Sequence, residues 1–240
     1  MTLARDDLGQ HVSQQFNEDL ENLHESVLRM GRLIERQLGD AVRALAQGDG
    51  ALATLVIGRD PDVNAMEIAI DEECSRVLVR RQPAAGDLRL IFAVIKAVTD
   101  LERMGDQAKR VARTALESAG SSRQRFGSSI AHLGELVLAL VGHALDAFAR
   151  LDIPTALRVA REDSTVDLEC RAITRQLLTY MMEDPRTIGA ALHLVWAARA
   201  LERAGDHAKN LAEYVVYAVH GRDLRHISAE ERERQLAQPT

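Results

Sequence analysis

Apolar side chains recur along the chain at steps of three and four residues, which is the spacing of one face of an α-helix. A half-buried β-strand would instead alternate apolar and polar residues. The first such stripe runs through Leu20, Leu23, Val27, Met30, Leu38 and Val42. Short stretches rich in glycine, proline and small polar residues interrupt the pattern. It predicts six long helices, at about residues 16–47, 51–82, 88–118, 128–151, 154–182 and 187–220.

The two halves of the chain carry nearly the same motif. Residues 101–112 read LERMGDQAKRVA and residues 201–212 read LERAGDHAKNLA, so eight of the twelve positions are identical. Upstream, residues 40–45 resemble residues 146–151. Because the similarity spans several helices in the same order, a three-helix unit occurs twice.

Long helices joined by short turns form antiparallel bundles. We therefore predict an all-α fold of two tandem, pseudo-symmetric three-helix bundles. The predicted units are residues 1–118 and 119–221, and the charged tail at 222–240 is expected to fray. Composition agrees, because aromatic residues make up only 3% of the chain, whereas β domains favour aromatic and β-branched side chains.

Charge and hydropathy narrow the classes of function. The net charge is −6 and the basic residues are dispersed, so nucleic acid is not an expected partner. The longest apolar run, residues 136–141, is far shorter than the ~20 residues of a membrane span, and the N-terminus lacks the apolar core of a signal peptide. Cys74 and Cys170 are expected to be free thiols in a reducing compartment. A cytoplasmic protein is predicted.

The repeated motif places two carboxylates one helical turn apart, at Glu102 and Asp106 and again at Glu202 and Asp206. The preceding helix of each half adds a stripe of oxygen-bearing side chains, which are Asp60, Asn64, Glu67 and Asp71 in the first half and Asp163 and Asp167 in the second. Such neighbours raise one another's pKa, so nearby cations or a divalent metal must offset the repulsion. A solvated acidic face with ion pairs and a metal site both remain open at this point.

Gly105 and Gly205 recur inside the motif, where glycine costs a helix about 1 kcal/mol relative to alanine. Their recurrence predicts the close approach of another helix or room for a ligand; inheritance from a duplicated ancestor is the alternative. Among single residues, Trp196 is expected in the core and His207 at the surface.

No phosphate-binding loop or nucleophile motif is present, which favours a protein that is not an enzyme. The rival interpretation is a carboxylate-bridged metalloenzyme in a helical bundle. Glu21 and His24 match the Glu-x-x-His spacing of di-iron bundles, but such a site needs a second copy of that motif.

The motif carries a family resemblance. Residues 100–106, DLERMGD, closely match the Asn/Asp-Leu-Glu-Arg-Ile-Gly-Asp signature of the PhoU family, and residues 200–206, ALERAGD, resemble a second copy. The resemblance covers nearly the whole chain. It implies a cytoplasmic regulator at the inner face of the membrane that restrains phosphate uptake and phosphate-starvation signalling. The implied partners are the ATPase of the phosphate ABC transporter, a membrane sensor histidine kinase and a second copy of the chain, as a homodimer.

Some members of that family bind multinuclear metal clusters. Carried over by position, the resemblance implies two ligand sets: Asp60, Glu67, Glu102 and Asp106, and then Asp163, Asp167, Glu202 and Asp206. Iron, zinc, magnesium and manganese are not distinguished. The chain departs from full symmetry at Asn64, which stands where the second half has Asp167, and at Ala200, which replaces Asp100. Asp100 lies about 200° around its helix from Glu102 and is expected to serve another surface.

Overall fold

The computed structural model describes residues 5–81, 83, 85–117 and 121–221, and within them every regular element is helical. The predicted all-α fold is confirmed. The elements are α1 (Arg5–Gln47), α2 (Gly50–Gly58), α3 (Asp60–Arg81), α4 (Ala85–Glu117), α5 (Ser121–Arg150), α6 (Ile153–Glu183), the 3₁₀ turn η1 (Pro185–Thr187) and α7 (Ile188–His220). The predicted tail at 222–240 lies outside the described residues, and so does the predicted boundary between 118 and 119.

The second predicted helix is in fact two helices, α2 and α3, which meet at Arg59. Pro61 explains the break, because it has no N–H to donate to the carbonyl of Ile57 and its ring clashes with that carbonyl. Asp49 caps the start of α2 by accepting a hydrogen bond from the Leu52 backbone N–H at 2.9 Å. Arg59 is held by an ion pair with Asp40 of α1 at 2.8 Å.

Two helices begin well before their predicted starts. α1 begins at Arg5, since no proline interrupts its polar first turns. α5 begins at Ser121, and its early part is anchored by Phe126, which is buried against Tyr180 of α6 with ring centroids 5.3 Å apart. Short-range patterns define helix ends less well than helix interiors.

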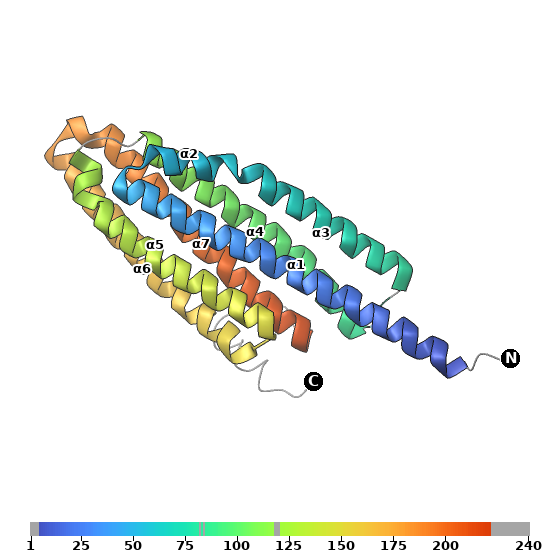
Figure 1. Cartoon of the computed structure of the whole chain (residues 1–240). Helices are drawn as coiled ribbons and strands as arrows, with labels where there is room; N and C mark the ends of the chain where they lie inside the picture. The colour runs from blue at the N-terminus through green and yellow to red at the C-terminus, as the bar shows by residue number, and fades with distance from the viewer. Residues whose placement is uncertain (1–4, 82, 84, 118–120, 222–240) are drawn as a thin grey trace.

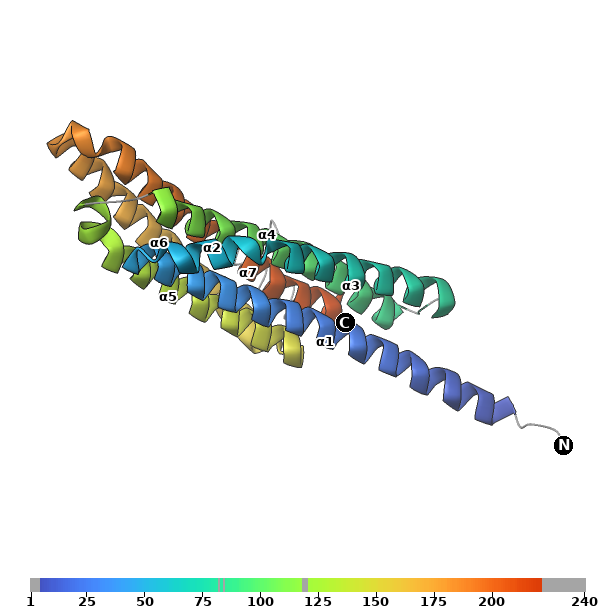
Figure 2. The same cartoon turned by 45° about the horizontal axis from the view of Figure 1, so that its top comes forward.

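The helices lie side by side in one elongated bundle, with α1 to α4 along one side and α5 to α7 along the other (Figures 1 and 2). The most extensive contact joins α4 to α7, the two helices that carry the repeated motif. They are antiparallel: Lys96, early in α4, stacks over Tyr217, late in α7, whereas Glu117 at the end of α4 pairs with His193 near the start of α7. One continuous apolar core therefore joins the two halves.

Among the described residues, one stretch is long and apolar enough to cross a membrane by length and composition alone. This is Gln124–Arg150 of α5, with a mean hydropathy of 1.4. In this fold α5 packs against α1, α6 and α7, and it buries Leu133, Val137 and Phe148 in the shared core. Core packing accounts for its apolar residues.

Both cysteines are buried free thiols, as predicted. Burial raises the pKa of Cys74 to about 12 and that of Cys170 to about 11, so both remain protonated at neutral pH.

Candidate functional site

The first acidic set consists of Asp60 and Glu67 on α3 with Glu102 and Asp106 on α4. The two helices bring these carboxylates into one electrostatic neighbourhood around Lys109. The Lys109 ammonium donates to Asp60 Oδ1 at 2.7 Å and forms an ion pair with Asp106 Oδ1 at 2.8 Å. A lysine of the motif itself is therefore the cation that offsets part of the repulsion.

Burial and the neighbouring charges raise the pKa values of Glu102 and Glu67 in this set. Burial raises the pKa of Glu102, and the charges of Asp106, Glu67 and Asp60 raise it further. Burial and the charge of Asp71 raise the pKa of Glu67. Burial alone would lower the pKa of Lys109, but its hydrogen bonds to Asp106 and Asp60 outweigh this and raise it. An added cation would stabilise the charged carboxylates.

The second acidic set consists of Asp163 and Asp167 on α6 with Glu202 and Asp206 on α7. Lys209 takes the place of Lys109 and donates to Asp163 Oδ2 at 2.8 Å. Asp163 is only 3% exposed, and its Oδ1 atom has no hydrogen-bond partner among the described residues. A buried carboxylate oxygen without a partner is costly and suits a cation ligand.

The carboxylates of the second set also interact. Burial raises the pKa of Asp206, followed by the charges of Asp163, Asp167 and Glu202. The pKa of Asp167 is raised by burial first and then by Asp163 and Glu202. Glu202 is partly neutralised by Arg199, whose Nη1 atom lies 2.9 Å and 2.8 Å from the two carboxylate oxygens.

The predicted close approach of another helix is found at Gly105 but not at Gly205. A Cβ atom at Gly105 would lie 3.0 Å from Ile34 Cδ1 and 3.4 Å from Val63 Cγ1. At Gly205 it would meet Val166 at 3.4 Å and Asp163 Oδ1 at 3.6 Å, which are ordinary contact distances. Gly105 is thus the more tightly packed position, and Gly205 borders the second acidic set.

The donor chemistry of both sets suits a hard or borderline divalent ion. In the present side-chain arrangement, however, no three His, Cys, Asp or Glu residues of the described chain converge closely enough to hold a metal. Lys109 and Lys209 occupy carboxylate oxygens that a metal would need. Metal binding therefore stays a prediction, and it requires the carboxylate side chains to move closer together.

Glu21 and His24 do not assemble a di-iron motif. The His24 Nε2 atom lies 2.9 Å from the Phe148 carbonyl oxygen of α5, and its ring stacks on Phe148 with centroids 5.3 Å apart. The imidazole is engaged in packing α1 against α5.

Two single-residue predictions were wrong. His207 is not a surface residue: its side chain is 14% exposed and its Nδ1 lies 2.6 Å from Asp100 Oδ1. Trp196 is not in the core: it is 58% exposed and borders a cavity between α4 and α7. Asp100 does serve a different surface from Glu102, as expected, because it is buried in the contact with α7.

The comparisons with known proteins agree with this architecture. The profile of the PhoU domain matches residues 27–115 and again residues 130–215. The chain is 51% identical over 226 residues to the phosphate-specific transport system accessory protein PhoU homolog of Pseudomonas aeruginosa, covering 94% of this chain and 93% of that protein. It is 45% identical over 230 residues to the PhoU accessory protein of Escherichia coli, covering 96% and 95%.

Two crystal structures have the same fold. PhoU from Pseudomonas aeruginosa superposes with a TM-score of 0.81 at 49% identity, covering 86% of this chain and all of that one. The phosphate transport system regulatory protein PhoU from Streptococcus pneumoniae gives 0.80 at 27% identity, covering 87% and 99%. These proteins are named as accessory and regulatory proteins rather than as enzymes. With both halves matched by the domain profile, the chain belongs to the PhoU family.

Proposed function

We propose that this protein is a cytoplasmic regulator that restrains phosphate uptake and phosphate-starvation signalling by protein contact. The observation that carries the proposal is the family match over both halves, together with relatives of the same length that are named accessory proteins of the phosphate-specific transport system. The proposed partners are the ATPase of the phosphate ABC transporter and a membrane sensor histidine kinase. The protein would reach the membrane only through them, and it would act as a homodimer.

The two acidic sets are the proposed metal sites of this regulator. The support is their donor chemistry, the raised carboxylate pKa values and the unpartnered Asp163 Oδ1. A bound divalent ion would stabilise α3 against α4 and α6 against α7, because each set draws ligands from two helices. Iron, zinc, magnesium and manganese are all compatible with these oxygen ligands.

We propose that the protein senses phosphate status through contact with its partner proteins, and that it does not bind phosphate at the acidic sets. Phosphate carries the same sign of charge as the carboxylates, and two like unit charges 4 Å apart repel by about 1 kcal/mol even in bulk water. Without metal, the acidic sets would therefore exclude phosphate.

Binding to the partners tests the proposal. The purified protein is immobilised and exposed to the transporter ATPase and to the cytoplasmic part of the kinase, with the ATPase of an unrelated ABC transporter as control. We expect saturable binding to the first two and none to the control. A folded protein that binds neither partner would contradict regulation by contact.

A further inference from the structure

The α4–α7 contact has two pseudo-equivalent ends. The repeat aligns Asp100 with Ala200, and it aligns His207, Asn210 and Tyr214 with Gln107, Arg110 and Thr114. Because α4 and α7 are antiparallel, the first group meets at one end of the contact and the second group at the other.

At the first end of the α4–α7 contact, side chains of α7 bind an anion that belongs to the chain itself, the carboxylate of Asp100. The Asp100 carboxylate accepts hydrogen bonds from His207 Nδ1 at 2.6 Å, Tyr214 Oη at 2.6 Å and Asn210 Nδ2 at 3.3 Å. Burial by itself raises the pKa of Asp100, but these three hydrogen bonds and the charge of His207 outweigh it and lower the pKa, so the group is ionised.

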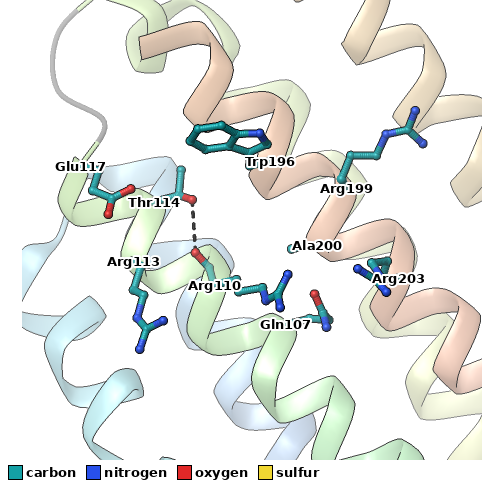
Figure 3. Close-up of a pocket in the computed structure, with 9 residues that line it drawn as sticks. All are labelled: Gln107, Arg110, Arg113, Thr114, Glu117, Trp196, Arg199, Ala200 and Arg203. Atoms are coloured by element: carbon teal, nitrogen blue, oxygen red, sulfur yellow. Dashed lines mark hydrogen bonds between the residues drawn. The ribbon is translucent and has the colours of Figure 1, made fainter. Parts of the chain in front are cut away.

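At the second end Ala200 offers only a methyl group where Asp100 has its carboxylate. A cavity of about 510 Å³ lies there between α4 and α7 (Figure 3). It is lined by Gln107, Arg110, Arg113, Thr114, Glu117, Trp196, Arg199, Ala200 and Arg203. Four arginines and one glutamate make this lining strongly basic on a chain whose net charge is −6.

Some polar groups of this cavity have partners within the chain, and others do not. Gln107 is 5% exposed; its Nε2 donates to the Arg103 carbonyl at 3.4 Å, and its Oε1, which can only accept a hydrogen bond, has no partner in the described part of the chain. It lies between Arg110 and Arg203 (Figure 3). Within the described residues, neither arginine has an ion-pair partner, whereas Arg199 is bound to Glu202 and Glu117 faces His193 at 3.0 Å. The side chains of Arg110 and Arg203 are exposed, and guanidinium groups without a carboxylate partner are suited to an external anion.

We propose that this cavity binds a small phosphate-bearing anion, held by Arg110 and Arg203, in the place that the Asp100 carboxylate has at the other end. Arginine matches phosphoryl oxygens with paired N–H donors. The cavity has the volume of a site for a small organic ligand and is much larger than one orthophosphate ion needs. Trp196 presents an exposed aromatic ring at its edge, on which a base can stack. The ligand class is thus an oligophosphate or a nucleotide.

The proposal goes beyond the partner contacts and metal sites proposed above. It places anion binding in the α4–α7 cavity, whose lining contains none of the eight carboxylates of the acidic sets. Its test needs only the purified protein with a chelator present, so that no metal at the acidic sets can bridge phosphate. Failure of one proposal is therefore distinguishable from failure of the other.

Trp196 is the only tryptophan of the chain, so its fluorescence reports directly on the cavity. The metal-free protein is titrated separately with orthophosphate, tripolyphosphate, ATP and adenosine. We expect a saturable change with tripolyphosphate and ATP and a much weaker response to orthophosphate and adenosine. ATP that binds about tenfold more tightly than tripolyphosphate identifies a nucleotide site, and equal affinities identify an oligophosphate site. No saturable response to any of the four would overturn the proposal.

The decisive variant is Ala200→Asp, which supplies the missing carboxylate from the chain and should abolish anion binding. Since Ala200 is buried, Arg110→Gln and Arg203→Gln are tested beside it; both replace exposed side chains, and each should weaken affinity about tenfold or more. Arg175→Gln, an exposed arginine on α6 away from the cavity, is the matched control and should bind as the wild type does. Wild-type affinity in both arginine variants would overturn the site.

Discussion

Asp100 of α4 accepts a 2.6 Å hydrogen bond from His207 of α7, and this contact joins the two halves of the repeat across their longest shared surface. The repeat aligns these two residues with Ala200 and Gln107, and that pair cannot form the same hydrogen bond because alanine has no carboxylate. The pseudo-symmetry of the fold is therefore broken at the interface between its halves, where one end is closed by the chain's own carboxylate.

Asp100→Ala should lower the free energy of unfolding by about 2–3 kcal/mol, because it removes the buried carboxylate that accepts hydrogen bonds from His207, Asn210 and Tyr214. Urea denaturation at neutral pH measures the loss. Asp146→Ala is the control, since Asp146 is exposed and its ion pair with Arg150 is long, at 3.8 Å. This variant should change stability by less than about 0.5 kcal/mol. Equal, small effects in both variants would contradict a structural role for Asp100.

The acidic sets predict a dependence of stability on pH. The pKa of Glu102 is raised in the folded protein, so the folded state binds more protons than the unfolded state from about pH 4 upward. Proton binding by Glu102 therefore favours the folded state at lower pH, and this contribution to stability is lost as pH rises through the folded pKa of Glu102. Without metal, Glu102→Gln should therefore be more stable than the wild type near about pH 7, and the difference should disappear toward about pH 4.

Thermal unfolding in chelator at both pH values checks this prediction. Glu72→Gln is the control, since Glu72 is exposed on α3 outside the first acidic set. A Glu102→Gln variant that is less stable than the wild type at neutral pH would show that the carboxylate is stabilised by its surroundings.

Metal content should depend on the second acidic set more than on the first. Replacing both Glu202 and Asp206 by alanine should remove more bound metal than replacing Glu102 and Asp106, because Asn64 leaves the first half without the counterpart of Asp167. Elemental analysis of protein purified without a metal-affinity step measures the content.

The control for that measurement is the double variant Glu21→Ala and Glu25→Ala, which removes two exposed acids four residues apart on α1. It should keep the wild-type metal content. If all three double variants retain the same metal, the assignment of the acidic sets is wrong.

The two glycines of the repeat should respond differently to alanine. Gly205→Ala meets only ordinary contacts, so it should gain up to about 1 kcal/mol from helix propensity. Gly105→Ala should gain less, because its Cβ would lie 3.0 Å from Ile34 Cδ1 and that side chain must shift. Chemical denaturation of both variants decides the order, and a larger gain at Gly105 would contradict the packing described here.

The repeat predicted the elements of the fold and the gathering of the carboxylates well. The charges of Asp60, Glu67 and Asp106 all act on Glu102, as facing helices require. Periodicity overlooked the break between α2 and α3, although Gly58 and Pro61 mark it in the sequence.

What sequence alone could not provide was the contact between halves. Whether Trp196 or His207 is buried depends on which helix of the other half lies against α7, and a one-dimensional pattern holds no such information. Ala200 opposite Gln107 marks the basic cavity, yet that relationship appears only once α4 and α7 are seen to be antiparallel.

Complementation tests the central claim, regulation of phosphate uptake, most directly. A bacterium that lacks its own PhoU-family protein but retains the transporter and the kinase expresses this chain, and phosphate uptake and a phosphate-starvation reporter are measured in phosphate-rich medium. We predict that the wild-type chain restores repression of both. A folded, well-expressed protein that leaves uptake and reporter at the level of the deletion strain would contradict the account.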